Sequence, residues 1–149
     1  MHTNRRRLAL HALLGLTAVV VMLAACGSAA NTGPGATPRE LDGTTWRAIQ
    51  LRDVAPIAGA EPTIRFAGDQ AGGTTGCNTY GGGYTLADDG TFRIVSMFMT
   101  EMGCPDGRAT QETVVIETLA DADRLEFLAD GSIRISGPSG ALIFVEDPR

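Results

Sequence analysis

Residues 72–83 read GGTTGCNTYGGG, and six of these twelve residues are glycine. Cys77 and Asn78 lie in the middle of the stretch. A glycine-rich segment around a cysteine could bind a phosphate, present a nucleophile, hold a metal ion, or turn a strand and supply half of a disulfide. The rest of the chain decides among these possibilities.

The N-terminal segment has the features of a bacterial export signal. Three arginines at residues 5–7 precede an apolar run over residues 8–25, which ends in small residues before Cys26. The sequence LAAC at residues 23–26 resembles a lipobox. This resemblance implies that residues 1–25 are a lipoprotein signal peptide, and that Cys26 carries a diacylglycerol on its thiol and usually an acyl chain on its new amine. An uncleaved membrane anchor and plain secretion remain as alternatives, because the apolar run is about as long as a transmembrane helix.

The composition beyond this signal is unusual. Both histidines, His2 and His11, lie within the signal, and every basic residue of the chain is an arginine. The mature chain therefore has no histidine and no lysine. Its nine arginines and 17 acidic residues give a side-chain charge of −8. We expect no nucleic-acid partner, since that binding depends on cations that neutralise phosphates, and the net charge argues against attraction to an anionic membrane surface.

The missing residue types exclude several kinds of active site. Without histidine, neither a Ser-His-Asp nor a Cys-His arrangement can form. Without lysine there is no Schiff base, and a phosphate-binding loop would need a lysine where Cys77 follows Gly76. Histidine-based zinc and copper sites are excluded as well. Paired carboxylates or a single cysteine remain for enzyme chemistry, and we expect no cofactor and no metal ion.

The mature chain divides into a tether and one domain. Residues 26–40 are mostly small and polar and are interrupted by Pro34 and Pro38. This composition predicts a lipidated flexible tether with an average span of roughly 20 Å. Residues 41–147 are long enough to form a single domain with its own core.

The domain sequence is rich in strand signals. Residues 44–51 and 63–68 each predict a strand, and residues 83–97 predict a hairpin with its turn at Asp88-Asp89-Gly90. Alternating apolar residues over 124–146 predict a three-stranded meander.

One helix is expected, over residues 108–122, where Val115, Leu119 and Ala122 share a face and Glu112 and Glu117 do not. A single amphipathic helix in a strand-rich chain must lay its apolar side on the sheet. We therefore predict an α+β fold, in which a curved antiparallel β-sheet, or half-barrel, is packed around one helix.

Several segments in the domain resemble, in order, the META domain of the HslJ-like family. The most specific is residues 63–86, and MTEMGCPD at 99–106 follows it. The matching residues are Trp46, Phe66, Gly76, Cys77, Asn78, Tyr80, Gly82, Tyr84, Thr100, Met102 and Cys104. The resemblance implies a half-barrel on a helix, a location in the cell envelope, no enzyme activity, and structural roles for the motif residues.

Two cysteines remain once Cys26 is lipidated. Cys77 and Cys104 form an even pair in an oxidising compartment, so we predict a structural disulfide between them. Their spacing is unlike the Cys-x-x-Cys of redox dithiols. Two buried free thiols and a catalytic thiol remain as alternatives.

The carboxylates and the methionine-rich segment favour structural roles. Asp88 and Asp89 lie at the predicted hairpin tip, where adjacent side chains point to opposite faces and cannot act together on one substrate. No calcium-binding loop with a terminal glutamate is present. The run IVSMFM at residues 94–99 could line a hydrophobic groove, although a place in the core is favoured.

These features predict a non-enzymatic, lipid-anchored protein on the extracytoplasmic side of the envelope, with a binding or envelope-stress role. Its partners would be the membrane, through the N-terminal lipid, and an unknown envelope protein or apolar ligand. One alternative is a pilot-like or carrier protein that holds an apolar ligand or peptide in the concavity of the half-barrel. A hydrolase would need two carboxylates about 5 to 10 Å apart in one cleft.

Overall fold

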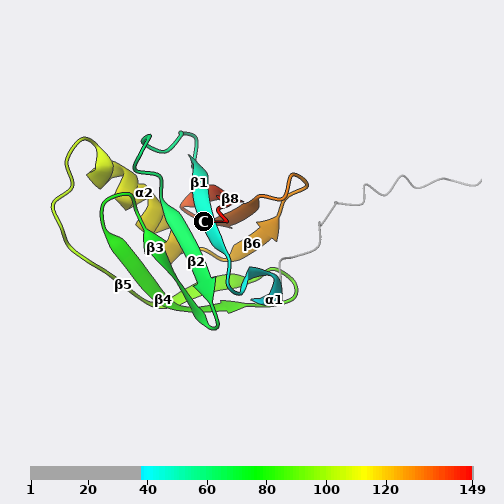
Figure 1. Cartoon of the computed structure of the whole chain (residues 1–149). Coiled ribbons are helices and arrows are strands. Elements are labelled where there is room, and N and C mark those ends of the chain that lie inside the picture. Colours follow the sequence, from blue (N-terminus) through cyan, green and yellow to red (C-terminus); the bar gives the residue numbers. More distant parts are fainter. Residues whose placement is uncertain (1–37, 149) are drawn as a thin grey trace, which may run out of the picture. The chain divides into compact units, whose positions relative to one another are not determined.

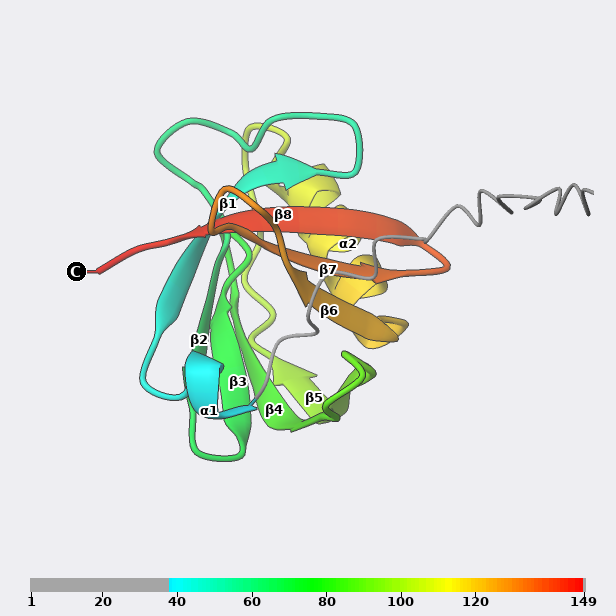
Figure 2. The same cartoon turned by 90° about the vertical axis from the view of Figure 1, so that its right-hand side faces the viewer.

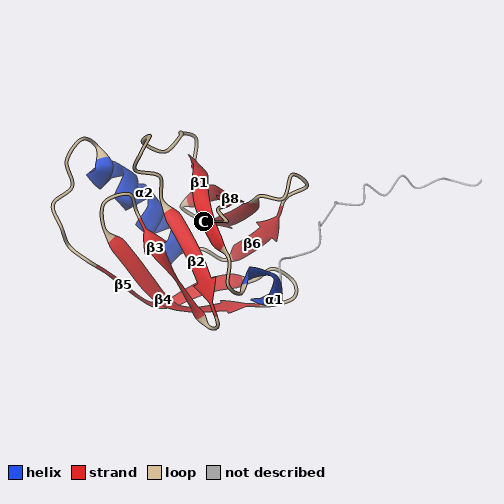
Figure 3. Ribbon diagram, in the orientation of Figure 1, coloured by secondary structure: helices blue, strands red, loops and turns tan. Residues whose placement is uncertain are grey.

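The computed structural model describes residues 38–148; the expected signal peptide, Cys26 and most of the expected tether lie outside this range. Eight antiparallel strands form one sheet in the order β5-β4-β3-β2-β1-β8-β7-β6 (Figure 3). The strands are β1 (Thr45–Leu51), β2 (Thr63–Ala67), β3 (Gln70–Thr74), β4 (Thr79–Leu86), β5 (Phe92–Met99), β6 (Arg124–Phe127), β7 (Ile133–Gly137) and β8 (Gly140–Glu146). The helices are α1 (Pro38–Leu41) and α2 (Arg108–Ala120), and α1 includes three residues that the sequence assigned to the tether.

The sheet curls until its two edge strands approach each other (Figures 1 and 2). At one end the Phe92 backbone N–H donates to the backbone carbonyl of Asp123, and the Leu125 backbone N–H donates to the carbonyl of Gly90. Elsewhere α2 lies against β1, β5, β7 and β8, on the concave side of the sheet. The predicted half-barrel around one helix is confirmed.

The core follows from the alternation along the strands. On β2, β7 and β8 the buried side chains alternate with more exposed ones, as Ile64 and Phe66 do on β2. On β1 the alternation shifts at a bulge between Ala48 and Gln50, after which Leu51 is buried. Phe66 also meets Tyr84 and Phe92, with ring centroids 5.2 and 6.4 Å away. These inward side chains fill the concavity and pack against Val115 and Leu119 of α2.

The glycine-rich stretch forms parts of two strands, β3 and β4, on either side of a turn over residues 75–78. Most of its glycines lie in strands, and β3 was not predicted, because glycine is a poor strand former and β3 contains two glycines. Strand β3 forms because it is hydrogen-bonded between β2 and β4. At Gly73, a Cβ would lie 2.1 Å from the Thr63 carbonyl oxygen, so the neighbouring backbones approach closely there. Gly76 has φ +91°, the left-handed conformation that glycine tolerates.

Helix α2 ends two residues earlier than predicted, at Ala120. Val115 and Leu119 are fully buried as expected, whereas Ala122 is buried beyond the end of the helix. Gln111 and Thr118 are also buried on this helix. Among the described residues, no helix is long and apolar enough to span a membrane.

The segment 94–99 divides between the two faces of β5. Ile94, Met97 and Met99 are partly buried against the core, in keeping with the favoured interpretation. Val95 and Phe98 lie on the opposite, outer face and are exposed. A register shift in the β4–β5 pairing, with Ser96 at φ 52°, sets this pattern.

Candidate functional site

Asn78 is the centre of the motif that the sequence singled out. The residue is 1% exposed. Its amide makes four hydrogen bonds to oxygen and nitrogen partners, and its Nδ2 also lies near the sulfurs of Cys77 and Cys104. The Oδ1 atom accepts from the Thr100 hydroxyl at 2.9 Å and from the Met102 backbone N–H at 2.8 Å. The Nδ2 atom donates to the Met102 carbonyl and to Glu112 Oε1, both at 3.1 Å. The hydrogen-bonding capacity of the amide is thus used within the fold, and none is left for a ligand.

Glu112 of α2 completes this network, and the sequence did not identify it. Its Oε2 accepts from the Thr75 hydroxyl at 2.6 Å and from the Asn78 backbone N–H at 3.3 Å. Next to it, the Gln111 amide donates to the carbonyls of Ala60 and Thr75. The predicted disulfide could have revealed this contact, because joining Cys104 to Cys77 brings the first turns of α2 against residues 75–78.

Cys77 and Cys104 form a disulfide, with their Cα atoms 5.8 Å apart. The predicted disulfide is therefore confirmed, and the alternatives of two free thiols and of a catalytic thiol are wrong. The two sulfurs and a Glu112 carboxylate oxygen lie within 4.8 Å of one another. Thiolates, not disulfide sulfurs, are the metal ligands that cysteine supplies. This cluster therefore cannot act as a Cys₂Glu metal site while the disulfide is intact.

The aromatic motif residues belong to the core. Trp46 and Phe66 are buried, and the Trp46 indole donates to the Thr44 hydroxyl at 2.7 Å. The Tyr80 hydroxyl donates to the Thr63 carbonyl at 2.9 Å, and burial raises the pKa of this phenol. Burial, Asp42 and Asp69 also raise the pKa of Tyr84.

Two further motif positions serve the backbone. A Cβ at Gly82 would lie 2.7 Å from the Val95 carbonyl oxygen, so only glycine fits there without a shift. The Met102 side chain is exposed, and Met102 acts in the network through its backbone. The contacts described for these motif residues are all made within the fold.

Three of the described carboxylates stabilise turns or hairpins. The Thr91 backbone N–H donates to Asp89 at 2.9 Å, which lowers the pKa of Asp89. The Ser132 hydroxyl and N–H donate to Asp130 and lower its pKa in the same way. Asp121 accepts from the Ser139 N–H and hydroxyl, which fixes the β7–β8 hairpin to the end of α2.

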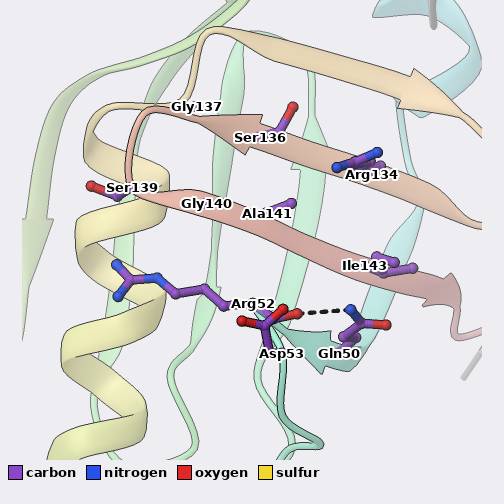
Figure 4. A pocket seen from close by; sticks show the side chains of 10 residues that line it. All are labelled: Gln50, Arg52, Asp53, Arg134, Ser136, Gly137, Ser139, Gly140, Ala141 and Ile143. Carbon is purple, nitrogen blue, oxygen red and sulfur yellow. Dashed lines mark hydrogen bonds between the residues drawn. The ribbon is translucent and has the colours of Figure 1, made fainter.

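One surface depression lies outside the concavity. It has a volume of about 620 Å³ and sits over β7, β8 and the end of β1 (Figure 4). Its lining residues are Gln50, Arg52, Asp53, Arg134, Ser136, Gly137, Ser139, Gly140, Ala141 and Ile143. Arg52 extends toward α2, where it pairs with Glu117 at 2.9 Å. Arg134, the other arginine in the lining, makes no ion pair among the described residues. The depression is lined mainly by polar side chains, and the Ser139 hydroxyl in its lining donates to Asp121.

The comparisons with known proteins agree with this fold. The sequence model of the META domain family matches residues 39–148. A search of curated proteins finds no match. A solved NMR structure of a protein from Burkholderia xenovorans is 25% identical, with a TM-score of 0.61 over 78% of this chain and 92% of that chain. A second NMR structure is 18% identical, with a TM-score of 0.63 over 74% of this chain and 94% of the other, and it shows similarity of fold alone.

Proposed function

Because this chain belongs to the META domain family, we propose that it is a lipid-anchored protein of the cell envelope with a binding or envelope-stress role and no catalytic activity. The META domain family is not a known enzyme family. The stress role is supported by the family resemblance, and the anchor by the lipobox-like sequence that ends at Cys26.

One observation carries the non-catalytic assignment. The polar groups of the motif, which are the first candidates for an active site, bond to each other: the Asn78 amide, the Glu112 carboxylate and the Thr75 hydroxyl. A catalytic group must be free to contact substrate, and these groups hold the 75–78 turn and the 100–104 segment on α2. Binding then falls to the surface, where polar side chains line the depression of Figure 4.

The alternative of a carrier with its ligand in the concavity has a physical objection. The concave side is occupied by core side chains, among them Phe66, Phe92 and Phe144, each with no exposed surface. An apolar ligand would have to displace α2 or these rings, at the expense of the core packing. We therefore favour the outer surface for binding. A rise in melting temperature with an added fatty acid, or lipid that co-purifies with the detergent-free domain, would reverse this choice.

The anchor is tested by comparing the wild-type chain with Cys26→Ser in an exporting bacterium. We expect the wild type in the membrane fraction, with an intact mass that begins at Cys26 and includes diacylglycerol. The substituted chain, which lacks the cysteine that is lipidated, should retain residues 1–25 and lack the diacylglycerol mass. A wild-type mass that retains residues 1–25 would contradict a cleaved lipid anchor and indicate the alternative membrane anchor.

A further inference from the structure

The outer face of the sheet separates positive from negative charge. We define the outer face as the strand positions whose side chains point away from the core. The register places five arginines on it, at 47 (β1), 65 (β2), 93 (β5), 124 (β6) and 134 (β7), and one acidic residue, Glu126. The other 16 of the 17 acidic residues lie elsewhere. The net charge of the chain therefore does not describe this surface.

Most of these arginines are available for a partner. Arg124 pairs with Glu126 at 2.9 Å. The other four, Arg47, Arg65, Arg93 and Arg134, make no ion pair with any residue in 38–148. Three of these four are exposed, and Arg47 is half-buried. A guanidinium binds phosphate oxygens in a bidentate manner, so this face suits a surface of phosphate groups.

Apolar side chains lie on the same face. Phe98 is 67% exposed and Val95 is 45% exposed. The Phe98 ring lies across its partner Gly81, since a Cβ there would be 2.8 Å from the ring. Beside it, a shallow groove of about 290 Å³ has Arg65 and Phe98 among its lining residues and runs over Gly72 and Gly81. Cations interspersed with an exposed aromatic ring are typical of surfaces that sit at the headgroup level of a bilayer.

The expected tether holds the domain within reach of a bilayer. Eleven residues separate Cys26 from Pro38, where the described fold begins. A flexible segment of this length spans roughly 20 Å on average, less than the size of the domain. Some face of an anchored domain must therefore lie near the membrane, and the acidic parts of the surface are repelled by anionic lipid.

We propose that the outer face of the sheet docks on the anionic phospholipid surface of the membrane that holds the lipid anchor, through Arg65, Arg93 and the neighbouring arginines, with Phe98 at the headgroup level. This orientation rests on the proposed lipid anchor. The contact of the face with anionic lipid is nevertheless testable without the anchor. The core lies within residues 41–144, and the NMR structure from Burkholderia xenovorans is almost entirely this domain, so residues 38–149 fold on their own.

The test is partition of residues 38–149 onto vesicles of phosphatidylcholine with 30 to 40% phosphatidylglycerol, measured by sedimentation. We expect binding at about 50 mM salt, weaker binding at about 300 mM, and little on pure phosphatidylcholine, because salt screens the attraction. Arg65→Gln should lower the partition coefficient about fivefold, the value for one basic residue near such a surface. R65Q/R93Q should lower it about 25-fold.

The matched control is Arg108→Gln, which removes the same charge at the start of α2. Its partition should change less than twofold. No binding to the anionic vesicles at low salt, equal losses for R65Q and R108Q, or equal binding to both lipid compositions would overturn the proposal. Binding of poly-glutamate, with the same dependence on Arg65 and without vesicle binding, would assign the face to an acidic protein instead. A Cys26→Ser result would not affect these outcomes, so failure of the anchor and failure of the docking are distinguishable.

Discussion

Replacing Glu112 by alanine tests whether the motif is a scaffold. The Thr75 hydroxyl and the Asn78 amide both donate to this carboxylate, and Thr75 and Asn78 are almost completely buried. Hydrogen bonds to a charged group contribute about 1.5 kcal/mol or more each, and buried donors that lose their acceptor keep their desolvation cost. The two shorter of the three bonds to Glu112 alone give an expected loss of about 3 kcal/mol in the free energy of unfolding, or roughly 12 °C in melting temperature.

The assay is urea unfolding of the oxidised domain, followed by the fluorescence of Trp46, the single tryptophan. Glu117→Ala is the matched control on the same helix. Its ion pair with Arg52 involves a carboxylate side chain that is 55% exposed, so the loss should be under about 1 kcal/mol. Glu112→Gln should fall between the two, since it keeps one acceptor oxygen. If E112A and E117A cost the same, the network does not hold the motif in place and the scaffold interpretation is wrong.

Three further results are expected. Reducing the Cys77–Cys104 disulfide, which closes a loop with a separation of 27 residues, should cost about 3.5 kcal/mol in urea unfolding, and neither thiol should alkylate before reductant is added. Gly76→Ala should lower the free energy of unfolding by about 3 kcal/mol, because φ is +91° and a Cβ would lie 2.1 Å from the Ala60 carbonyl oxygen. Gly103→Ala, with open space around the site, should change it by less than about 0.5 kcal/mol. Similar values for the two variants would refute the close-approach argument. The pKa of Asp130 is lowered in the fold, so the contribution of its carboxylate to stability is present above the ordinary aspartate pKa and is lost as the pH falls. The gap in melting temperature between the wild type and Asp130→Asn should therefore close from pH 5 to pH 2. A constant gap would contradict this.

Local patterns predicted the elements that carry their own signal. The meander, the hairpin with its Asp-Asp-Gly turn and the helix all have periodicity or turn residues, and they appear close to their predicted positions. Strand β3 has neither, because its glycines weaken the strand preference and its pairing partners lie on both sides in the sheet. Only the assembled sheet shows that these glycines allow neighbouring backbones to approach closely.

Tertiary contacts explain what the sequence missed at the candidate site. Glu112 looked like a solvated residue of the polar helix face, and its role depends on a turn that is 34 residues away along the chain at Asn78. The basic outer face was hidden in the same way. Its arginines are spread over five strands, and the acidic residues between them along the chain, apart from Glu126 of β6, fall in turns, loops and α2.

The most direct measurement of the central claim, that the outer face is where the anchored domain meets its partner, is photocrosslinking in cells. A photoreactive side chain would replace Thr85, exposed on the outer face of β4, or Thr113, which is also exposed, on α2. Adducts would be identified by mass spectrometry. We predict adducts with membrane phospholipid from position 85 and few from position 113. Equal adducts from both positions, or adducts from position 113 alone, would contradict the claim.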